Sequence, residues 1–306
     1  MTALVELGND GWLKPGRFRW LWALAIMAFL AVLCVLTFNV TADATLRLAA
    51  LLTGDPFTTR GAAPHGARLA AVLAGSLAML GAYALAVRFG ERRVASELDL
   101  RRAPYELAMG IAIGAAIMAV IIGILWGAGW AVISASPITA VAESLKQTVQ
   151  SAVIEEVLLR IIIFRMLWRG LGVWPALLAT ALLFGALHLS NPDASLFGAL
   201  CLVAGEGVGA GLYMLTGRIW LSIGMHAGWN FAQGWLFGSA VSGLDNFAGG
   251  PLQTHPAEGV ATLLSGGGFG PEASITALIV SLLCSGLFLS LAWKKGRFVT
   301  DEKGPV

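Results

Sequence analysis

The sequence predicts an all-α, polytopic membrane protein, a bundle of about eight transmembrane helices. Two observations carry this prediction. The 306 residues are 57% hydrophobic and only 12% charged, about half the charged fraction of a soluble domain. So few charges cannot cover a water-facing surface. The apolar residues also occur in runs of about twenty, the length that crosses the ~30 Å hydrocarbon core of a bilayer.

The apolar runs define eight predicted spans separated by polar stretches. In chain order they cover about residues 20–38, 69–87, 107–133, 148–167, 174–189, 196–215, 219–237 and 273–293. A long Gly/Ser-rich loop separates the last two spans. No internal repeat of the transporter kind divides the chain, so we expect residues 1–306 to form a single membrane domain.

The lysines and arginines predict how this stack is oriented. Eight spans place most of them on one side of the membrane, namely Lys14, Arg17, Arg19, Arg88, Arg92, Arg93, Arg101, Arg102, Arg165, Arg169, Arg218, Lys294, Lys295 and Arg297. Because basic loops stay in the cytoplasm, we expect both termini to be cytoplasmic in a plasma (inner) membrane. Arg47, Arg60 and Arg68 fall on the opposite side. The net charge of +2 gives no reason to expect a nucleic-acid partner.

The fourth span carries three charged side chains, Glu155, Glu156 and Arg160. A charge at bilayer depth costs at least about 2.5–3.5 kcal/mol, so such residues face the bundle interior and usually have a function. Arg160 follows Glu156 by four residues and can neutralise it on the same helix face. Glu155 is rotated from Glu156 by about 100° and is free to act as a base. A purely structural ion-pair cluster is the alternative.

Two further spans place imidazole and amide groups at membrane depth. His188 lies near the end of the fifth span, and His226 and Asn230 share one face of the seventh. Each of them alone could serve hydrogen bonding between helices. Together with Glu155 they could deprotonate a water molecule and stabilise a developing oxyanion. The set therefore indicates hydrolysis of an amide bond inside a membrane.

These residues also resemble the motifs of a known family. The motifs are Glu155-Glu156-x-x-x-Arg160, Phe184-x-x-x-His188 and His226-x-x-x-Asn230. In this order they are similar to the three motifs of the CAAX prenyl endopeptidase and bacteriocin-processing (CPBP, or Abi) family of intramembrane proteases. The resemblance covers about residues 105–235, the expected catalytic core around an active-site cavity. It implies an endopeptidase that hydrolyses membrane-associated proteins or peptides amid membrane lipid.

The resemblance further implies a role for each motif residue. The implied roles are Glu155 as the base that activates water, His188 holding that water, His226 and Asn230 stabilising the oxyanion, Glu156 and Arg160 as a supporting pair, and Phe184 walling the cavity. The family is described both with zinc and with a metal-free glutamate mechanism. If zinc is present, its ligands would be Glu155, His188 and His226, which suit this metal. The H-E-x-x-H motif is absent, and we expect no obligatory, tightly bound metal.

Several alternatives stay open at the level of sequence. Glu206, in the sixth span, could pair with Arg218 or line the cavity. The predicted orientation places Glu155 and His188 in the outer half of the membrane, whereas an enzyme for prenylated proteins should open to the cytoplasm. A non-catalytic membrane partner on the same fold, such as an immunity protein or a regulator of a sensor kinase, is the second hypothesis. A proton or ion relay through the glutamates is the third, disfavoured by the lack of inverted repeats.

Overall fold

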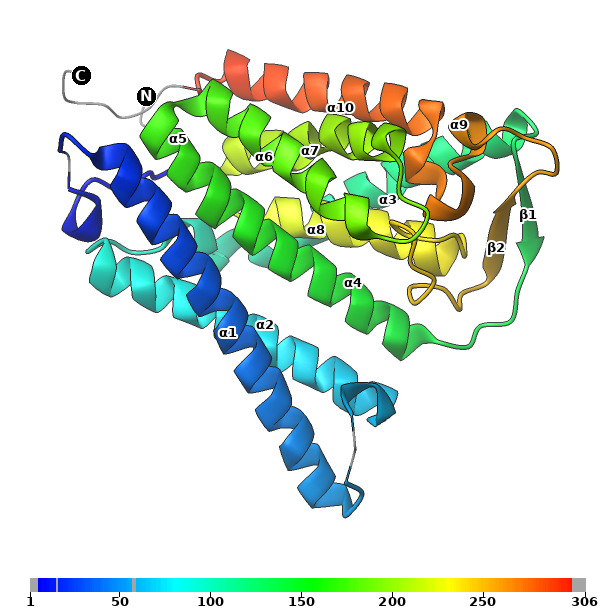
Figure 1. Cartoon of the computed structure of the whole chain (residues 1–306), viewed down its shortest axis with the longest axis horizontal. Helices are drawn as coiled ribbons and strands as arrows, with labels where there is room; N and C mark the ends of the chain where they lie inside the picture. The colour runs from blue at the N-terminus through cyan, green and yellow to red at the C-terminus, as the bar shows by residue number, and fades with distance from the viewer. Residues whose placement is uncertain (1–4, 15, 57–58, 299–306) are drawn as a thin grey trace.

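The computed structural model describes residues 5–14, 16–56 and 59–298, and it confirms the all-α membrane bundle (Figure 1). The helices are α1 (Arg19–Thr53), α2 (His65–Gly90), α3 (Ala103–Gly127), α4 (Val141–Glu156), α5 (Arg165–Leu171), α6 (Val173–Leu187), α7 (Leu196–Thr216), α8 (Trp220–Asn230), α9 (Thr262–Ser265) and α10 (Ile275–Lys294). Within the described residues, six helices are long and apolar enough to cross a membrane, those containing α1, α2, α3, α6, α7 and α10. The protein is therefore a multi-pass membrane protein.

Two of the eight predicted spans form helices that do not meet this criterion. The fourth is longer than predicted, because α4 continues through a π-helical segment, η5 (Val157–Phe164), into α5. It carries the charged residues of the first motif. The seventh consists of α8 and a second π-helical segment, η7 (Phe231–Leu236), and is short. Both segments still lie among the six long helices (Figure 1).

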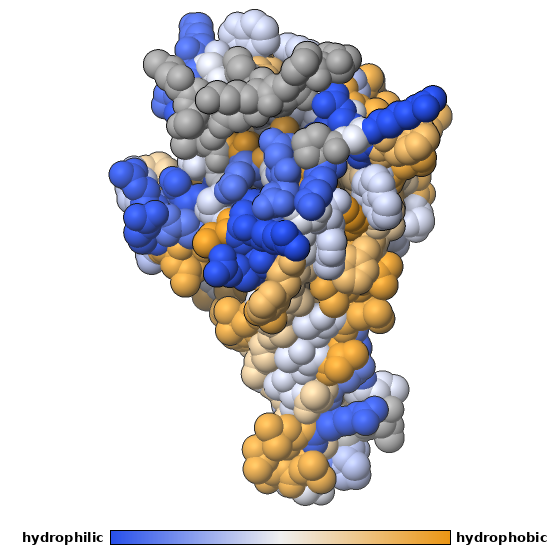
Figure 2. All heavy atoms as spheres, turned by 90° about the vertical axis from the view of Figure 1, so that its left-hand side faces the viewer, coloured by the Kyte–Doolittle hydropathy of each residue, from blue (hydrophilic) through white to orange (hydrophobic). Residues whose placement is uncertain are grey.

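The two ends of the described chain lie at the same end of the bundle. The Nη1 atom of Arg165, at the start of α5, donates a hydrogen bond of 3.1 Å to the backbone oxygen of Leu7. The ring of Trp174, at the start of α6, lies 5.0 Å from that of Phe298. Figure 2 views this side of the molecule and shows hydrophilic side chains gathered over the bundle. Below them, the projecting part of α1 and α2 is more apolar.

Buried ion pairs fasten the helices at this terminal end. Arg165, which is fully buried, pairs with Glu91 at 2.6 Å. Arg93 pairs with Glu97 at 2.8 Å and with Glu91 at 2.7 Å. Arg93 and Arg165, two of the basic residues that predict the orientation of the chain, thus also connect the loop after α2 to α5. Each of these carboxylates has a cation within contact distance, as burial of a charge requires.

A short two-stranded sheet at the opposite end of the bundle was not predicted. Strands β1 (Ala131–Ala135) and β2 (Leu252–Pro256) pair antiparallel, with Ile133 opposite Thr254. The third span was predicted to run to residue 133, and that boundary is wrong because α3 ends at Gly127. Gly129 follows in the left-handed region at φ +73°, a conformation that stops a helix and that glycine adopts without cost.

Close packing of α3 against α8 sets the position of the third motif. Gly110 and Gly114 on α3 face the α8 backbone, where Gly224 and Gly228 in turn face α3. A Cβ atom at Gly114 would lie 1.9 Å from the backbone oxygen of Met225. Small residues allow membrane helices to approach this closely. The turn of α8 that carries the motif is therefore held rigidly against α3.

Candidate active site

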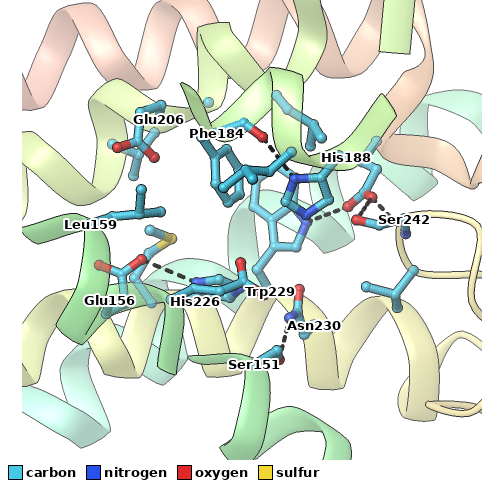
Figure 3. Close-up of a pocket in the computed structure, with 18 of the residues that line it drawn as sticks. Ser151, Glu156, Leu159, Phe184, His188, Glu206, His226, Trp229, Asn230 and Ser242 are labelled. Carbon is cyan, nitrogen blue, oxygen red and sulfur yellow. Dashed lines mark hydrogen bonds and ion pairs between the residues drawn. The ribbon is translucent and has the colours of Figure 1, made fainter. Parts of the chain in front are cut away.

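A cavity of about 400 Å³ lies between α4, η5, α6, α7 and α8. All seven residues predicted from the sequence line it, namely Glu155, Glu156, Arg160, Phe184, His188, His226 and Asn230, and Glu206 lines it too. Most of the remaining lining is apolar, from residues such as Leu159, Leu202 and Met225. Figure 3 shows these polar groups converging from separate helices. Such a cavity, apolar with a few convergent polar groups, is typical of a binding or catalytic site.

Both π-helical segments begin directly after a motif residue. The segment η5 follows Glu156, and η7 follows Asn230. A π-helical turn has one more residue than an α-helical turn and so shifts the face on which later side chains lie, and such turns are frequent at functional sites. Sequence periodicity assumes 3.6 residues per turn and gives no sign of these shifts.

Glu156, Arg160 and Glu206 form a fully buried ion cluster at one wall of the cavity. The Nε atom of Arg160 lies 2.8 Å from Glu156 Oε2, and its Nη2 atom lies 2.9 Å from Glu206 Oε2. The predicted pair between Glu156 and Arg160 is therefore present in the structure. Glu206 joins it, whereas Arg218 pairs with Glu106 instead. The guanidinium of Arg160 bridges the two carboxylates and so connects α4 and η5 to α7. The carboxylate of Glu156 is thereby engaged in an ion pair.

His226 lies between the two adjacent glutamates of the first motif. Its Nδ1 atom is 3.1 Å from Glu156 Oε1, and its Nε2 atom is 3.7 Å from Glu155 Oε2. A carboxylate partner at Nδ1 holds the proton there and orients the ring, as in other buried carboxylate–histidine pairs. Ser222 also donates to Glu156 and to the backbone oxygen of Gly209.

Glu155 is the accessible carboxylate of this set. Its side chain is 31% exposed, against 2% for those of Glu156 and Glu206. No described Lys or Arg forms an ion pair with it, and its charged-pair contact is His226. A carboxylate that is open to the cavity and free of an arginine can accept a proton from water or substrate.

His188 presents one ring nitrogen to the cavity. Its Nδ1 atom lies 2.8 Å from the backbone oxygen of Phe184. Because a carbonyl oxygen only accepts hydrogen bonds, Nδ1 carries a proton in this geometry, and Nε2 of the neutral ring is an acceptor. The Phe184 ring lies edge-on to the imidazole at 4.6 Å between centroids, which fixes the ring plane.

Asn230 is oriented by a residue that the sequence analysis did not identify. Its Nδ2 atom donates a hydrogen bond of 3.0 Å to Ser151 Oγ. The second N–H of the amide remains available to the cavity that Asn230 lines. Ser151 precedes Glu155 by four residues, and Ser222 precedes His226 by four. A polar residue one turn before a motif residue was therefore a usable signal for both serines.

A metal ion in this cavity would need several His, Cys, Asp or Glu side chains grouped around it. Among residues 5–14, 16–56 and 59–298, no group of three or more His, Cys, Asp or Glu side chains is arranged to hold one. Glu155, His188 and His226, the ligands expected if zinc is present, line the same cavity without forming such a group.

Comparison with known proteins supports the resemblance seen in the motifs. Residues 137–232 match the family model described as "Type II CAAX prenyl endopeptidase Rce1-like". This segment contains all three motifs. This segment is therefore similar to the Rce1-like type II CAAX prenyl endopeptidases, as the motifs predicted. No curated protein and no solved structure matched the chain.

Proposed function

We propose that this chain, with its Rce1-like domain at residues 137–232, is an intramembrane endopeptidase that cleaves membrane-associated proteins or peptides. The observation that carries the proposal is the position of Glu155. It is the exposed carboxylate of a mostly apolar cavity, and two imidazoles line the same cavity. Its neighbour Glu156 is paired with Arg160 and His226 and so is not available to accept a proton from water.

The proposed reaction begins with water held between Glu155 and the Nε2 atom of His188. Glu155 removes a proton as the water oxygen bonds to the scissile carbonyl carbon, and the π electrons of the carbonyl move to its oxygen. Asn230 and His226 donate hydrogen bonds to that oxyanion. For His226 to donate from Nε2 while Nδ1 donates to Glu156, the ring must be doubly protonated. The C–N bond then breaks, and the proton on Glu155 passes to the leaving nitrogen.

We further propose that no tightly bound metal is required. Support comes from the donor set, because the described side chains suited to zinc do not form a ligand group. Treating purified protein with a strong zinc chelator should leave its cleavage rate within about twofold of the untreated rate. A loss that is restored by added zinc would instead show that a metal acts in the reaction.

The orientation proposed from the basic residues places both termini in the cytoplasm of a plasma (inner) membrane. Asn191, Ser242 and Phe247 line the cavity and belong to loops at the end of the bundle that carries β1 and β2, away from the termini. We therefore propose that the cavity opens on the non-cytoplasmic side. Labelling of Ser190→Cys and Lys295→Cys in intact cells by a membrane-impermeant maleimide tests this orientation, because Lys295 is exposed directly after α10. Labelling at Ser190→Cys alone is expected, and the reverse pattern would overturn it.

The experiment that tests the activity compares membranes from cells carrying the wild-type chain with membranes carrying Glu155→Gln. New peptide termini are mapped by mass spectrometry in both. Fragments found only with the wild-type chain are expected, because the variant lacks the base. If a biological effect of the protein persists in Glu155→Gln while the two fragment maps agree, the chain acts as a non-catalytic membrane partner and the proposal is wrong.

A further inference from the structure

Glu272 is a buried carboxylate at the rim of the cavity that the proposed reaction does not use. It lies between α9 and α10, outside residues 137–232, and its exposed fraction is 3%. Within the described parts of the chain, no Lys or Arg forms an ion pair with it. Its charge is instead held by three donors, because the Oε1 atom accepts from Ser242 N at 2.7 Å and Ser242 Oγ at 2.6 Å, and Oε2 accepts from Trp229 Nε1 at 3.2 Å.

These hydrogen bonds hold a loop in a conformation that it would not otherwise favour. Ser242 has φ +50° and Gly243 has φ +79°. A left-handed serine is uncommon and persists only where its surroundings enforce it, often at functional sites. Here Asn191 Nδ2 also donates to the Ser242 backbone oxygen at 2.9 Å, and the Gly243 N–H donates to Phe269 O at 2.8 Å.

The loop so held forms part of the wall of the cavity. Val241, Ser242, Leu244 and Phe247 all line it. On the other side of Glu272, Trp229 lies one residue before Asn230 and three after His226. Trp229 and Ser242, both labelled in Figure 3, each donate a hydrogen bond to Glu272. One buried group thus connects the loop wall to the helix that carries the third motif.

We propose that Glu272 is a positioning residue that clamps residues 241–247 as the outer wall of the cavity and thereby sets how tightly substrate is held. The inference deepens the proposed function and rests on it for its kinetic consequence. The clamp itself is a statement about structure and can be measured without activity. Loss of the carboxylate should release the strained loop and weaken substrate binding, while the groups around Glu155 stay in place.

Four variants distinguish the hydrogen bonds of Glu272 to Ser242 from its hydrogen bond to Trp229. Glu272→Ala removes both sets. Glu272→Gln keeps an oxygen acceptor for the two Ser242 donors but turns an N–H towards Trp229. Trp229→Phe removes only the indole donor, and Ser242→Ala removes one of the two donors on the loop. The matched control is Glu258→Gln, which changes an exposed carboxylate before α9.

The activity-independent measurement is limited chymotrypsin digestion in detergent micelles. Phe247 is 4% exposed and should resist cleavage in the wild-type chain and in Glu258→Gln. Cleavage after Phe247 is expected in Glu272→Ala, and restored protection in Glu272→Gln. Equal protection of Phe247 in Glu272→Ala and wild type would overturn the clamp, whether or not the protein proves to be a protease.

The kinetic measurement uses a peptide that the wild-type chain cleaves, selected from a panel of synthetic acylated peptides. Glu272→Ala should raise KM by at least about tenfold with kcat within about threefold of wild type, the pattern of lost substrate binding. A fall in kcat with unchanged KM would overturn the positioning role. If no peptide is cleaved but Phe247 becomes accessible in Glu272→Ala, the clamp stands and the proposed function fails.

Discussion

The Nδ1 atom of His226 lies 3.1 Å from Oε1 of Glu156, a residue 70 positions away in the chain. This contact joins the first motif to the third across the cavity. It gives Glu156 the task of holding an imidazole, in addition to its pairing with Arg160. Glu155, one residue earlier, is left facing the cavity, so two adjacent glutamates receive different environments from one turn of helix.

The shared cation of the buried cluster should be essential for stability. Replacing Arg160 with Met leaves Glu156 and Glu206 buried without their guanidinium, a loss of about 3–5 kcal/mol for a broken buried pair. The free energy of unfolding in mixed micelles measures this. The control is Arg101→Met, because the Arg101 side chain is 88% exposed and should change stability by no more than about 0.5 kcal/mol. Equal stability of the two variants would contradict the role given to Arg160.

His188 should be needed for activity and dispensable for folding. Its hydrogen bond to the Phe184 backbone only orients the ring, so His188→Ala should leave the unfolding midpoint nearly unchanged. Cleavage should slow by about 10²–10⁴-fold, the usual contribution of a positioned acid or base. His255→Ala, an exposed histidine of β2, is the matched control. A comparable effect of both substitutions would remove His188 from the mechanism.

Asn230 and Ser151 should act as one unit. Asn230→Ala is expected to lower kcat by about 10²–10³-fold, as loss of an oxyanion donor does. Ser151→Ala removes the orienting hydrogen bond of 3.0 Å to Asn230 and the hydroxyl's own bond to the Gln147 backbone oxygen. A loss of about fivefold in kcat is expected from losing the bond to Asn230. The double variant should be no slower than Asn230→Ala alone. Multiplied effects would mean that Ser151 acts independently of Asn230.

Stability should depend on pH through Glu143, which lies at the start of α4 before the predicted fourth span. Burial alone would raise the pKa of this carboxyl, but hydrogen bonds from Lys146 and His65 and the charges of Lys146 and Arg68 hold the pKa below its ordinary value. A carboxyl with a lowered folded pKa stabilises the fold above its unfolded pKa, and that contribution is lost as pH falls through the folded pKa.

Glu143→Gln should therefore lower the unfolding midpoint at pH 7. The difference from wild type should begin to shrink as the pH falls below the pKa of an unfolded glutamate, about 4.3, and should vanish as the pH falls through the lowered pKa of folded Glu143. Unfolding curves of both proteins at pH 7 and pH 3 give the comparison. A difference of equal size at both pH values would show that Glu143 stabilises the protein by packing and not by charge.

Much of the site could be predicted from sequence because polar and charged residues are rare within membrane spans. Glu155, His188, His226 and Asn230 were identified as polar groups at bilayer depth, where such groups are costly, and the structure places them around one cavity. The pairing of Glu156 with Arg160 followed from their four-residue spacing. The arrangement of these residues was predicted, whereas their individual roles remain proposals.

Other features needed the folded chain. Glu206 pairs with Arg160, 46 residues away in the sequence, and Glu272 bonds to Ser242, 30 residues away. Helical periodicity relates only residues a few positions apart, so it could not predict these contacts. The π-helical segments after Glu156 and Asn230 leave hydrophobic patterns that read as ordinary helix. The sheet of β1 and β2 was missed because β1 continues an apolar run and β2 lies in a loop rich in glycine.

The most direct test of the central claim is the cleavage rate of purified Glu155→Gln in proteoliposomes. The substrate is a panel of synthetic acylated peptides, and new termini are read by mass spectrometry. The wild-type chain should cleave at least one peptide, and Glu155→Gln should cleave it about 10³-fold more slowly or not at all, with an unchanged unfolding midpoint. A Glu155→Gln rate within tenfold of wild type would contradict the assignment of Glu155 as the base.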